Sequence, residues 1–431
     1  MQTASKKVIN GWAMFDWANS VYNLVITSTI FPAYYESITK QDGDDKVEFL
    51  GRTFVNTALY TYAMASAILI VAFLIPILSS IADYKGNKKS FMRFFSTTGA
   101  LACAFLYFFK TEASLNIAIL CMMVACIGYW ASLVFYNAYL PEIAAEEDRD
   151  IVSAKGFTMG YIGSVILQVT CLVLVFTMTD GALAAQLSFL LVGLWWLVWS
   201  QYSLSRLPEG NPAAHRPDKS IFANGFIELK KVYRQVKDMP VLKRFLASFF
   251  FYNMGVQTVM LAAALFGAKE LNMPTQNLIV TILIIQLVAI AGAYLMAKLA
   301  GKFGNLQVLA FVVVIWIFIC VAAYYTTTTI QFYCIGAAVG LVMGGIQSLS
   351  RSTYSKLMPP TKDTASFFSF FDTTEKIAVV IGMFTFALLE ELTGSMRNSV
   401  LAIMIFFIIG LILLFITISA QKKSSLQQQV S

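Results

Sequence analysis

The chain has little charge and almost no histidine. Only 13% of its 431 residues are charged, whereas 58% are hydrophobic, more apolar side chain than a soluble protein of this size can bury. The single histidine, His215, excludes the commonest intramembrane metal sites, and the sequence contains no HExxH helix, nucleophile elbow or Walker loop. All six cysteines lie inside apolar runs, which favours small buried side chains over a disulfide framework. We therefore expect no enzyme activity, no metal or cofactor and no nucleic-acid partner.

Long apolar runs take the place of the missing charge. A membrane-spanning helix needs roughly 20 apolar residues, and we find twelve runs of that kind, so most of the chain is expected inside a bilayer. They cover residues 9–36, 54–81, 91–109, 115–141, 151–178, 184–204, 243–268, 277–300, 306–325, 329–356, 366–390 and 398–420. The fold class predicted is an all-α membrane protein with twelve transmembrane helices in two pseudo-symmetric six-helix bundles, residues 1–204 and 241–431.

The basic residues predict the orientation of the chain. Most of the 31 Lys and Arg residues fall in segments on the same side as the two termini, so the positive-inside rule places both termini in the cytoplasm. The membrane would be the inner (plasma) membrane if the protein is bacterial, and the first span would be its own anchor.

Residues 205–240 form the predicted cytoplasmic linker between the bundles. Apolar residues recur every three or four positions from Phe222 to Val236, beside several lysines and Arg234. This spacing predicts an amphipathic helix on the membrane surface, where anionic lipid is the expected partner. A solvated basic loop is the alternative.

An internal repeat relates the two halves of the chain. The loop after the second span and the loop after the eighth share three residue identities, and the ends of the fourth and tenth spans share two more. The matches are Ala82, Gly86 and Asn87 with Ala300, Gly304 and Asn305, and Tyr136 and Pro141 with Tyr354 and Pro359. Parallel repeats of this kind favour a substrate site between two halves, near the middle of the membrane.

The repeated loop also resembles a known family. Residues Ser79 to Lys89 read SSIADYKGNKK, similar to the loop between helices two and three of the major facilitator superfamily. Asp83, Gly86, Lys88 and Lys89 match that pattern, whereas Ser79, Tyr84 and Asn87 depart from it. Three further stretches resemble the branch of autophagy-related vacuolar amino-acid effluxers and their bacterial relatives: Gly11–Asn23, Tyr136–Ala144 with Ser153–Ser164, and Gly344–Ser352. The resemblance implies solute transport, with amino acids as the best-known cargo, and a cytoplasmic gate loop formed by the four matching residues.

Polar residues inside spans are costly and normally face a cavity or a partner. In the first span Asp16, Asn19, Ser20, Asn23 and Thr27 would form one stripe of an α-helix. Three other spans carry similar sets: Tyr129, Ser132, Tyr136 and Asn137; Asn253 and Gln257; and Gln347, Ser350, Arg351 and Tyr354. The resemblance places these four spans around the central cavity, so we expect them to line the substrate and proton path. Hydrogen bonding between helices is the alternative.

The eleventh span carries three charged residues, Asp372, Glu375 and Lys376. The i, i+4 spacing predicts that Asp372 pairs with Lys376 and leaves Glu375 for another partner. We hypothesise that carboxylates of the first and eleventh spans pair with Arg351 to close a cytoplasmic gate. A carboxylate that gains and loses such a partner changes its proton affinity, which would couple a proton gradient to transport. A static salt-bridge network is the alternative.

Two further patterns concern motion and closure. Glycines recur at residues 336, 340 and 344 and at residues 156, 160 and 163, which predicts close approach of helix backbones. The acidic cluster Glu142, Glu146, Glu147, Asp148 and Asp150 is either a solvated turn or a partner for Arg206 or the linker.

Secondary active transport of a small polar solute by alternating access is the function predicted. An amino acid is the cargo favoured, and a proton or other ion gradient is the driving force. The alternatives are a transporter-shaped receptor or scaffold without net transport, and an exporter of amphipathic compounds.

Overall fold

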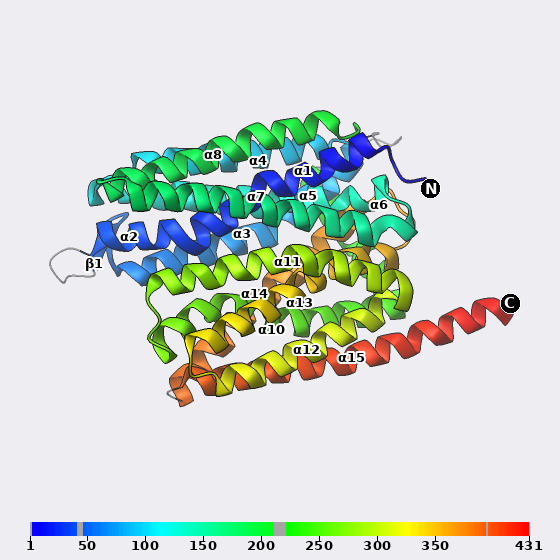
Figure 1. The fold of residues 1–431 in the computed structure, drawn as a ribbon. Coiled ribbons are helices and arrows are strands. Elements are labelled where there is room, and N and C mark those ends of the chain that lie inside the picture. The colour runs from blue at the N-terminus through cyan, green and yellow to red at the C-terminus, as the bar shows by residue number, and fades with distance from the viewer. Residues whose placement is uncertain (1, 41–45, 211–220, 394, 431) are drawn as a thin grey trace. The chain divides into compact units, whose positions relative to one another are not determined.

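The computed structural model describes residues 2–40, 46–210, 221–393 and 395–430 (Figure 1). Contacts between residues divide the chain into two compact units. The N-terminal unit consists of Ala4–Tyr139 and Met159–Phe222, and the C-terminal unit of Met1–Thr3, Leu140–Thr158 and Ala223–Ser431. The first turns of one helix, α7, thus belong to the C-terminal unit, while the predicted bundle limits at residues 204 and 241 stay predictions.

Helices make up most of the N-terminal unit, and α4 packs against both α5 and α8. Its elements are α1 (Lys6–Val21), the π-helix η1 (Tyr22–Ile30), α2 (Phe31–Thr39), β1 (Lys46–Phe49), β2 (Arg52–Val55), α3 (Asn56–Lys85), α4 (Lys88–Phe105), the 3-10 turns η2 (Leu106–Phe108) and η3 (Glu112–Ser114), α5 (Leu115–Ala138), the later part of α7 (Arg149–Thr177) and α8 (Gly181–Arg206). Its buried core is built from aromatic and aliphatic side chains of α1, η1, α2, α5 and α8.

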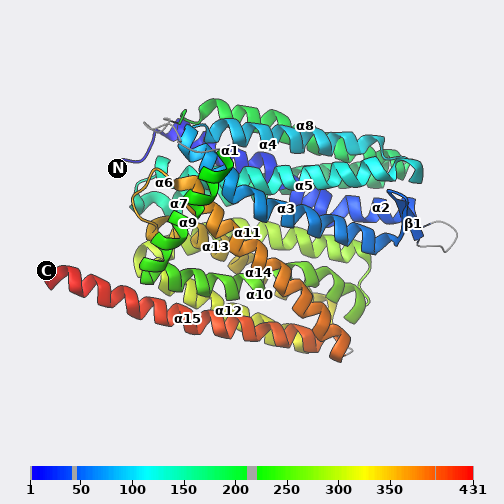
Figure 2. The same cartoon turned by 180° about the vertical axis from the view of Figure 1, so that it is seen from behind.

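In the C-terminal unit, the helix pairs α11 with α13 and α10 with α15 make the most extensive contacts. The elements are α6 (Leu140–Ile143), η4 (Glu146–Asp148), the start of α7, α9 (Ile221–Asp238), α10 (Pro240–Glu270), α11 (Thr275–Phe303), α12 (Asn305–Tyr325), α13 (Thr329–Leu357), α14 (Thr364–Thr393) and α15 (Met396–Val430). Seen from behind, α9 crosses the beginning of α14 (Figure 2), where Lys231 pairs with Asp363 at 3.1 Å. A helix therefore occupies the place where an amphipathic helix is predicted. Part of the predicted linker, with Pro212, His215 and Pro217, lies outside the described residues.

Each predicted apolar run overlaps an observed helix. Within the described part of the chain, nine helices are long and apolar enough to cross a membrane. The helical membrane architecture is confirmed, while the count of twelve spans stays a prediction.

The first predicted span is not one continuous α-helix, which corrects the expected polar stripe. From Tyr22 to Ile30 the backbone is a π-helix, whose hydrogen bonds join residues five apart. The Thr29 hydroxyl accordingly donates to the carbonyl of Leu24, five residues earlier, at 2.8 Å. Asp16 and Asn19 are buried, whereas Asn23, inside the π-helix, is exposed.

A short β-hairpin between α2 and α3 was not expected in an all-α chain. Phe49 pairs with Arg52 across a two-residue turn in which Leu50 and Gly51 have φ of 48° and 76°. Positive φ at both positions gives the turn a twist that suits a hairpin. The Leu50 N–H donates to the Asn116 side chain at 3.1 Å, which fixes the turn to α5.

The glycines predicted to allow close helix packing do so. A Cβ on Gly340 would lie 2.4 Å from the Ile285 carbonyl oxygen, and one on Gly344 would lie 2.3 Å from the Ala289 carbonyl oxygen. In the N-terminal unit, a Cβ on Gly163 would lie 2.7 Å from the Trp17 carbonyl oxygen. The close approach of α13 to α11, and of α7 to α1, is therefore confirmed.

Candidate functional site

The charged residues of α14 lie in the C-terminal unit, against α10. Lys376 and Asp372 form an ion pair, with 2.6 Å between Nζ and Oδ1, and both residues are almost fully buried. The predicted i, i+4 pair is thus confirmed. Glu375 has a different partner, as expected, because the Gln257 amide of α10 donates to Glu375 Oε1 at 3.1 Å.

Asn253 lies on the same face of α10 as two residues that touch α14. Phe249 lies one turn before Asn253, and its ring stacks on Phe371 with centroids 4.2 Å apart. Gln257 lies one turn after Asn253. Asn253 is 5% exposed. In the described part of the chain, its Nδ2 and the Oδ2 of Asp372 have no hydrogen-bond partner.

Arg351 of α13 is held by the start of α7, within the same unit. Its Nε donates to the Ser153 hydroxyl at 2.9 Å, and its Nη2 donates to the Ser153 carbonyl at 2.8 Å. The guanidinium also lies 4.2 Å from the centroid of the Phe157 ring, a favourable cation–π geometry. Gln347 lies one turn before Arg351 on α13 and is partly buried. The hypothesis that Arg351 closes a gate with carboxylates of the first and eleventh spans stays a prediction.

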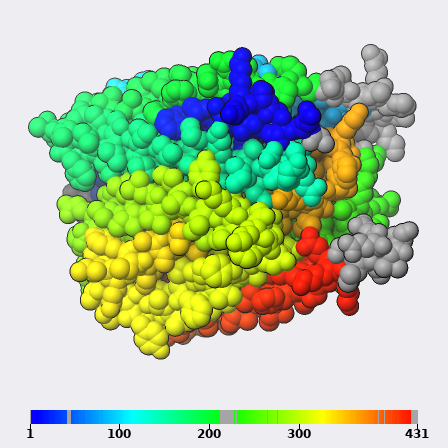
Figure 3. All heavy atoms as spheres, turned by 45° about the vertical axis from the view of Figure 1, so that its right-hand side comes forward, coloured from blue at the N-terminus to red at the C-terminus, as the bar shows by residue number. Residues whose placement is uncertain are grey.

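Further contacts join the start of α7 to α12 and α13. The Asp150 carboxylate accepts from Lys356 at 2.6 Å and from the Asn305 amide at 2.6 Å, while Arg149 donates to the Ser355 carbonyl at 2.8 Å. Glu142 of α6 accepts from Thr364, the first residue of α14, at 2.5 Å. In the space-filling view, teal and orange residues of the C-terminal unit lie against each other (Figure 3). A pocket of about 330 Å³ opens beside this network, lined by Glu146, Asn305, Gln307, Thr353, Lys356 and Gln421, among others. Two members of the acidic cluster, Asp150 and Glu142, thus contact other helices, whereas Glu146, Glu147 and Asp148 are exposed. The predicted pairing with Arg206 or the linker stays a prediction.

Asp16 and Tyr136 meet in the N-terminal unit. The Tyr136 hydroxyl donates to Asp16 Oδ2 at 2.7 Å. The Trp12 ring stacks on Tyr136 at 4.4 Å, and its Nε1 donates to the Tyr136 carbonyl at 2.9 Å. The structure thus joins polar residues of the first and fourth spans by hydrogen bonding between helices, the alternative to a cavity lining, whereas Asn137 is only half-buried. The role of these residues in a substrate path stays a prediction.

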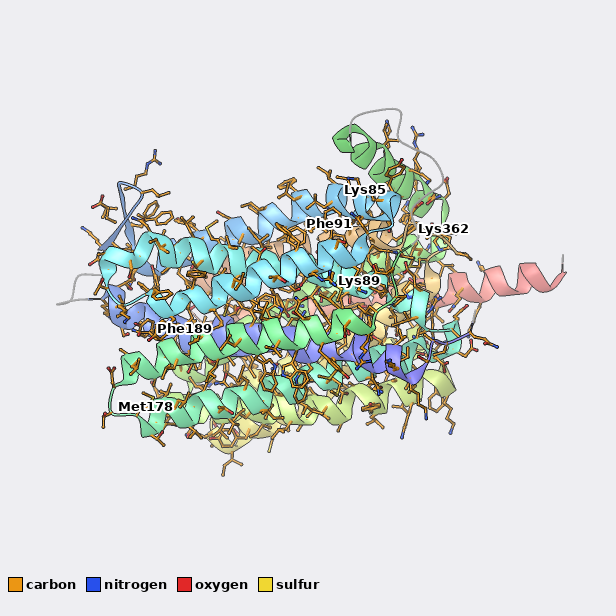
Figure 4. The ribbon with its side chains drawn as sticks, turned by 90° about the horizontal axis from the view of Figure 1, so that it is seen from above. Lys85, Lys89, Phe91, Met178, Phe189 and Lys362 are labelled. Carbon is orange, nitrogen blue, oxygen red and sulfur yellow. The ribbon has the colours of Figure 1, made fainter. Side chains whose placement is uncertain are left out.

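The predicted gate loop is packed against the residues that follow α8. Lys89 donates to Glu209 at 2.6 Å and to the Leu207 carbonyl at 3.0 Å, and Figure 4 shows it at the start of α4, near the end of α8. Asp83 and Lys88 pair at 3.6 Å. Gly86 ends α3 with φ of 63°, a conformation that favours glycine. All four predicted loop residues therefore lie together.

Comparisons with known proteins agree over nearly the whole chain. A family model described as "Vacuole effluxer Atg22 like" matches residues 4–149 and 145–428. The chain belongs to this Atg22-like family. The uncharacterized MFS-type transporter YxiO of Bacillus subtilis is 32% identical over 411 residues, which cover 94% of this chain and 93% of YxiO. Autophagy-related protein 22 of Kluyveromyces lactis is 26% identical, with 94% of this chain and 92% of the yeast protein covered.

The fold of this Atg22-like protein is similar to that of the human organic anion transporter MFSD10. The TM-score is 0.75 at 10% sequence identity, covering 95% of this chain and 99% of MFSD10. The predicted fold class and family are thus confirmed: the chain is an integral, multi-pass membrane transporter of the major facilitator superfamily, in its Atg22-like branch.

Sequence reasoning missed two functional candidates in this Atg22-like transporter. Asn305 was noted only as the repeat partner of Asn87, and Lys356 was not considered. The repeat was the available signal, because it placed Asn305 at the position in the C-terminal half that corresponds to the gate loop. No spacing along the chain links either residue to Asp150, so the network depends on tertiary packing.

Proposed function

We propose that this Atg22-like transporter couples the movement of a small polar solute, an amino acid, to a proton gradient, with Glu375 as the proton carrier. The position of Glu375, partly buried beside a neutral amide, carries the proposal. The Asp372 charge is balanced by Lys376 at 2.6 Å, whereas the hydrogen-bond partner of Glu375 in the described structure is Gln257.

Charge counting supports this role. The α10 and α14 side chains that meet here hold two carboxylates and one ammonium, so one negative charge is unbalanced when all three are ionised. A charge that is partly removed from water and has no counter-ion is costly, and a proton on Glu375 removes that charge. Among the described residues, the ionisable groups that interact electrostatically with Glu375 are Asp372 and Lys376 on its own helix and Tyr252 on α10.

Glu375 would exchange its proton with only one side of the membrane at a time. This would couple the flux of protons to the flux of the solute. When Glu375 faces water, the charged form is solvated and the proton leaves. When the site is closed, the protonated form donates to the Gln257 side-chain oxygen, so the amide serves both states. Gln257 has this capacity because an amide both donates and accepts hydrogen bonds.

The amino-acid cargo is supported by the description of the family as vacuole effluxers and by buried groups of both signs. In the C-terminal unit, the buried Arg351 supplies a positive charge, and the buried Asp372 and the partly buried Glu375 supply negative charges. We further propose that both termini are cytoplasmic. The basic side chains of α9 that face outward, Lys230, Lys231, Arg234 and Lys237, would then meet anionic lipid head groups.

Reconstituted proteoliposomes test the proposal. Wild-type protein should accumulate labelled amino acids when a pH gradient is imposed, and a pH-sensitive dye should report a matching proton flux. Glu375→Gln should lose gradient-driven accumulation but keep exchange of internal for external solute, because exchange needs no net proton movement. Glu390→Gln is the matched control: it removes a carboxylate from the far end of α14, paired with Lys269 at 3.1 Å. Unchanged accumulation and proton flux in Glu375→Gln would show that the proton is carried elsewhere.

A further inference from the structure

We infer that Asp372 and Asn253 form the cargo-binding subsite. In this subsite Asp372 binds a cationic nitrogen of the solute, and Asn253 binds a hydrogen-bond acceptor of the same solute. The inference rests on the proposed function and assigns the recognition of the cargo to a pair of atoms distinct from the proton carrier Glu375.

The two residues lie at the same level of two packed helices. Phe249, Asn253 and Gln257 occupy successive turns on one face of α10, and the outer two contact Phe371 and Glu375 of α14. Asn253 is therefore level with the α14 turn that contains Asp372. Both side chains are more than nine-tenths buried, with exposures of 5% and 3%.

Their unused atoms are complementary to a zwitterion. Asp372 Oδ2 is an acceptor without a donor, and Asn253 Nδ2 is a donor without an acceptor, in the part of the chain that the structure describes. Buried polar atoms in this condition are uncommon and call for a ligand or a water molecule. An ammonium group satisfies Asp372, and a carboxylate or carbonyl oxygen satisfies Asn253.

Lys376 prepares Asp372 for this role. Its ammonium lies 2.6 Å from Oδ1, which holds the carboxylate in place and leaves Oδ2 to accept from the cargo. A solute that has only an amine, or only an acid, satisfies one of the two atoms. We therefore expect the subsite to prefer solutes that carry both groups.

Equilibrium binding to the purified full-length chain tests the subsite without reference to proton coupling. The probes are the twenty common L-amino acids and, for each one that binds, its amide and its analogue without the amino group. Binding is measured by isothermal titration calorimetry in detergent. We expect the analogue without the amino group to bind at least about tenfold more weakly, since it cannot donate to Asp372.

Asn253→Leu is the decisive variant, because leucine has a similar volume and introduces no charge. It should weaken the binding of the intact amino acid at least about tenfold, and weaken the amide less. Ser248→Ala is the matched control on α10. The Ser248 hydroxyl donates to the Gly410 carbonyl on α15 at 2.7 Å, away from α14. The Ser248→Ala variant should therefore bind amino acids with the affinity of wild type.

A second variant removes the ion pair as a unit. Asp372→Asn combined with Lys376→Gln removes both charges of the pair together and should abolish the preference for amine-bearing probes. The inference is overturned if this double variant or Asn253→Leu binds amino acids with wild-type affinity, or if no amine-bearing probe binds to wild type. If Glu375→Gln loses proton coupling but still binds amino acids more tightly than their analogues without the amino group, both the proton carrier and the subsite are supported. If Glu375→Gln loses proton coupling and the subsite variants bind like wild type, only the subsite is contradicted.

Discussion

At the scale of single residues, the Asp16–Tyr136 contact shows how a buried carboxylate is kept in the N-terminal unit. Tyr136→Phe removes the hydroxyl that donates to Asp16 at 2.7 Å but keeps the ring that stacks on Trp12. We expect a loss of about 1–3 kcal/mol in the free energy of unfolding, the usual range when a buried charged group loses a donor. Denaturation in mixed micelles, followed by circular dichroism, measures it.

The control for this substitution is Tyr325→Phe, which removes a hydroxyl from a residue that is 73% exposed and should leave the unfolding free energy unchanged. If Tyr136→Phe unfolds at the same denaturant concentration as wild type, the Tyr136 hydroxyl is not needed to stabilise the Asp16 carboxylate.

Residue contacts within a helix could be predicted, and those between helices could not. The spacing of Asp372 and Lys376 is sufficient to pair them, because residues four apart share a helix face. The Gln257–Glu375 bond depends on the rotation of α10 against α14, which no spacing within either segment specifies. The contacts of Asp150 with Asn305 and Lys356 join three helices and were missed for the same reason.

At the scale of elements, the packing of α13 against α11 depends on glycine. A Cβ added at Gly340 would lie 2.4 Å from the carbonyl oxygen of Ile285, and a backbone atom cannot move aside as a flexible side chain can. Gly340→Ala should therefore destabilise the protein by about 1–3 kcal/mol, the cost typical of overpacking. Thermal unfolding in detergent is the measurement.

Gly301→Ala provides the opposite expectation on the neighbouring helix. Nothing lies within 4 Å of a Cβ at Gly301, so alanine should stabilise α11 by about 0.5–1 kcal/mol through its higher helix propensity. Equal melting temperatures for the two variants would mean that the close approach of the helices is not maintained in solution.

The existence of the helices could be predicted from the apolar runs, but their local irregularities could not. The π-helix η1 has the same composition as an α-helical span, and only Pro32, just after it, gives a physical reason for a wider turn. Its ring cannot donate a backbone hydrogen bond and would clash with the carbonyl four residues earlier. The hairpin was missed because its turn places a leucine at φ of 48°, which is uncommon for a residue with a side chain.

At the scale of the whole molecule, the orientation of the chain can be tested with single cysteines. The variants are Ser5→Cys before α1, Glu48→Cys in β1 and Lys422→Cys near the end of α15, all at exposed positions. A membrane-impermeant maleimide is added to intact and to permeabilised cells, and wild type serves as the blank for native cysteines such as the exposed Cys334. We expect Glu48→Cys to react in intact cells, and the other two only after permeabilisation, because the basic segments retain the termini in the cytoplasm.

The pattern of labelling also tests the number of spans. Ser5 and Glu48 are separated by one predicted crossing, so they must react from opposite sides. Ser5 and Lys422 are separated by twelve, and an even number returns the chain to the side on which it began. Reaction of Ser5→Cys and Lys422→Cys from different sides would make the number of crossings odd. It would contradict the twelve-span count even though the fold is that of the major facilitator superfamily.

Reaction of both Ser5→Cys and Lys422→Cys from outside would keep an even count and reverse the orientation. The start of α14, with Asp372 and Glu375, would then lie toward the outer side of the membrane.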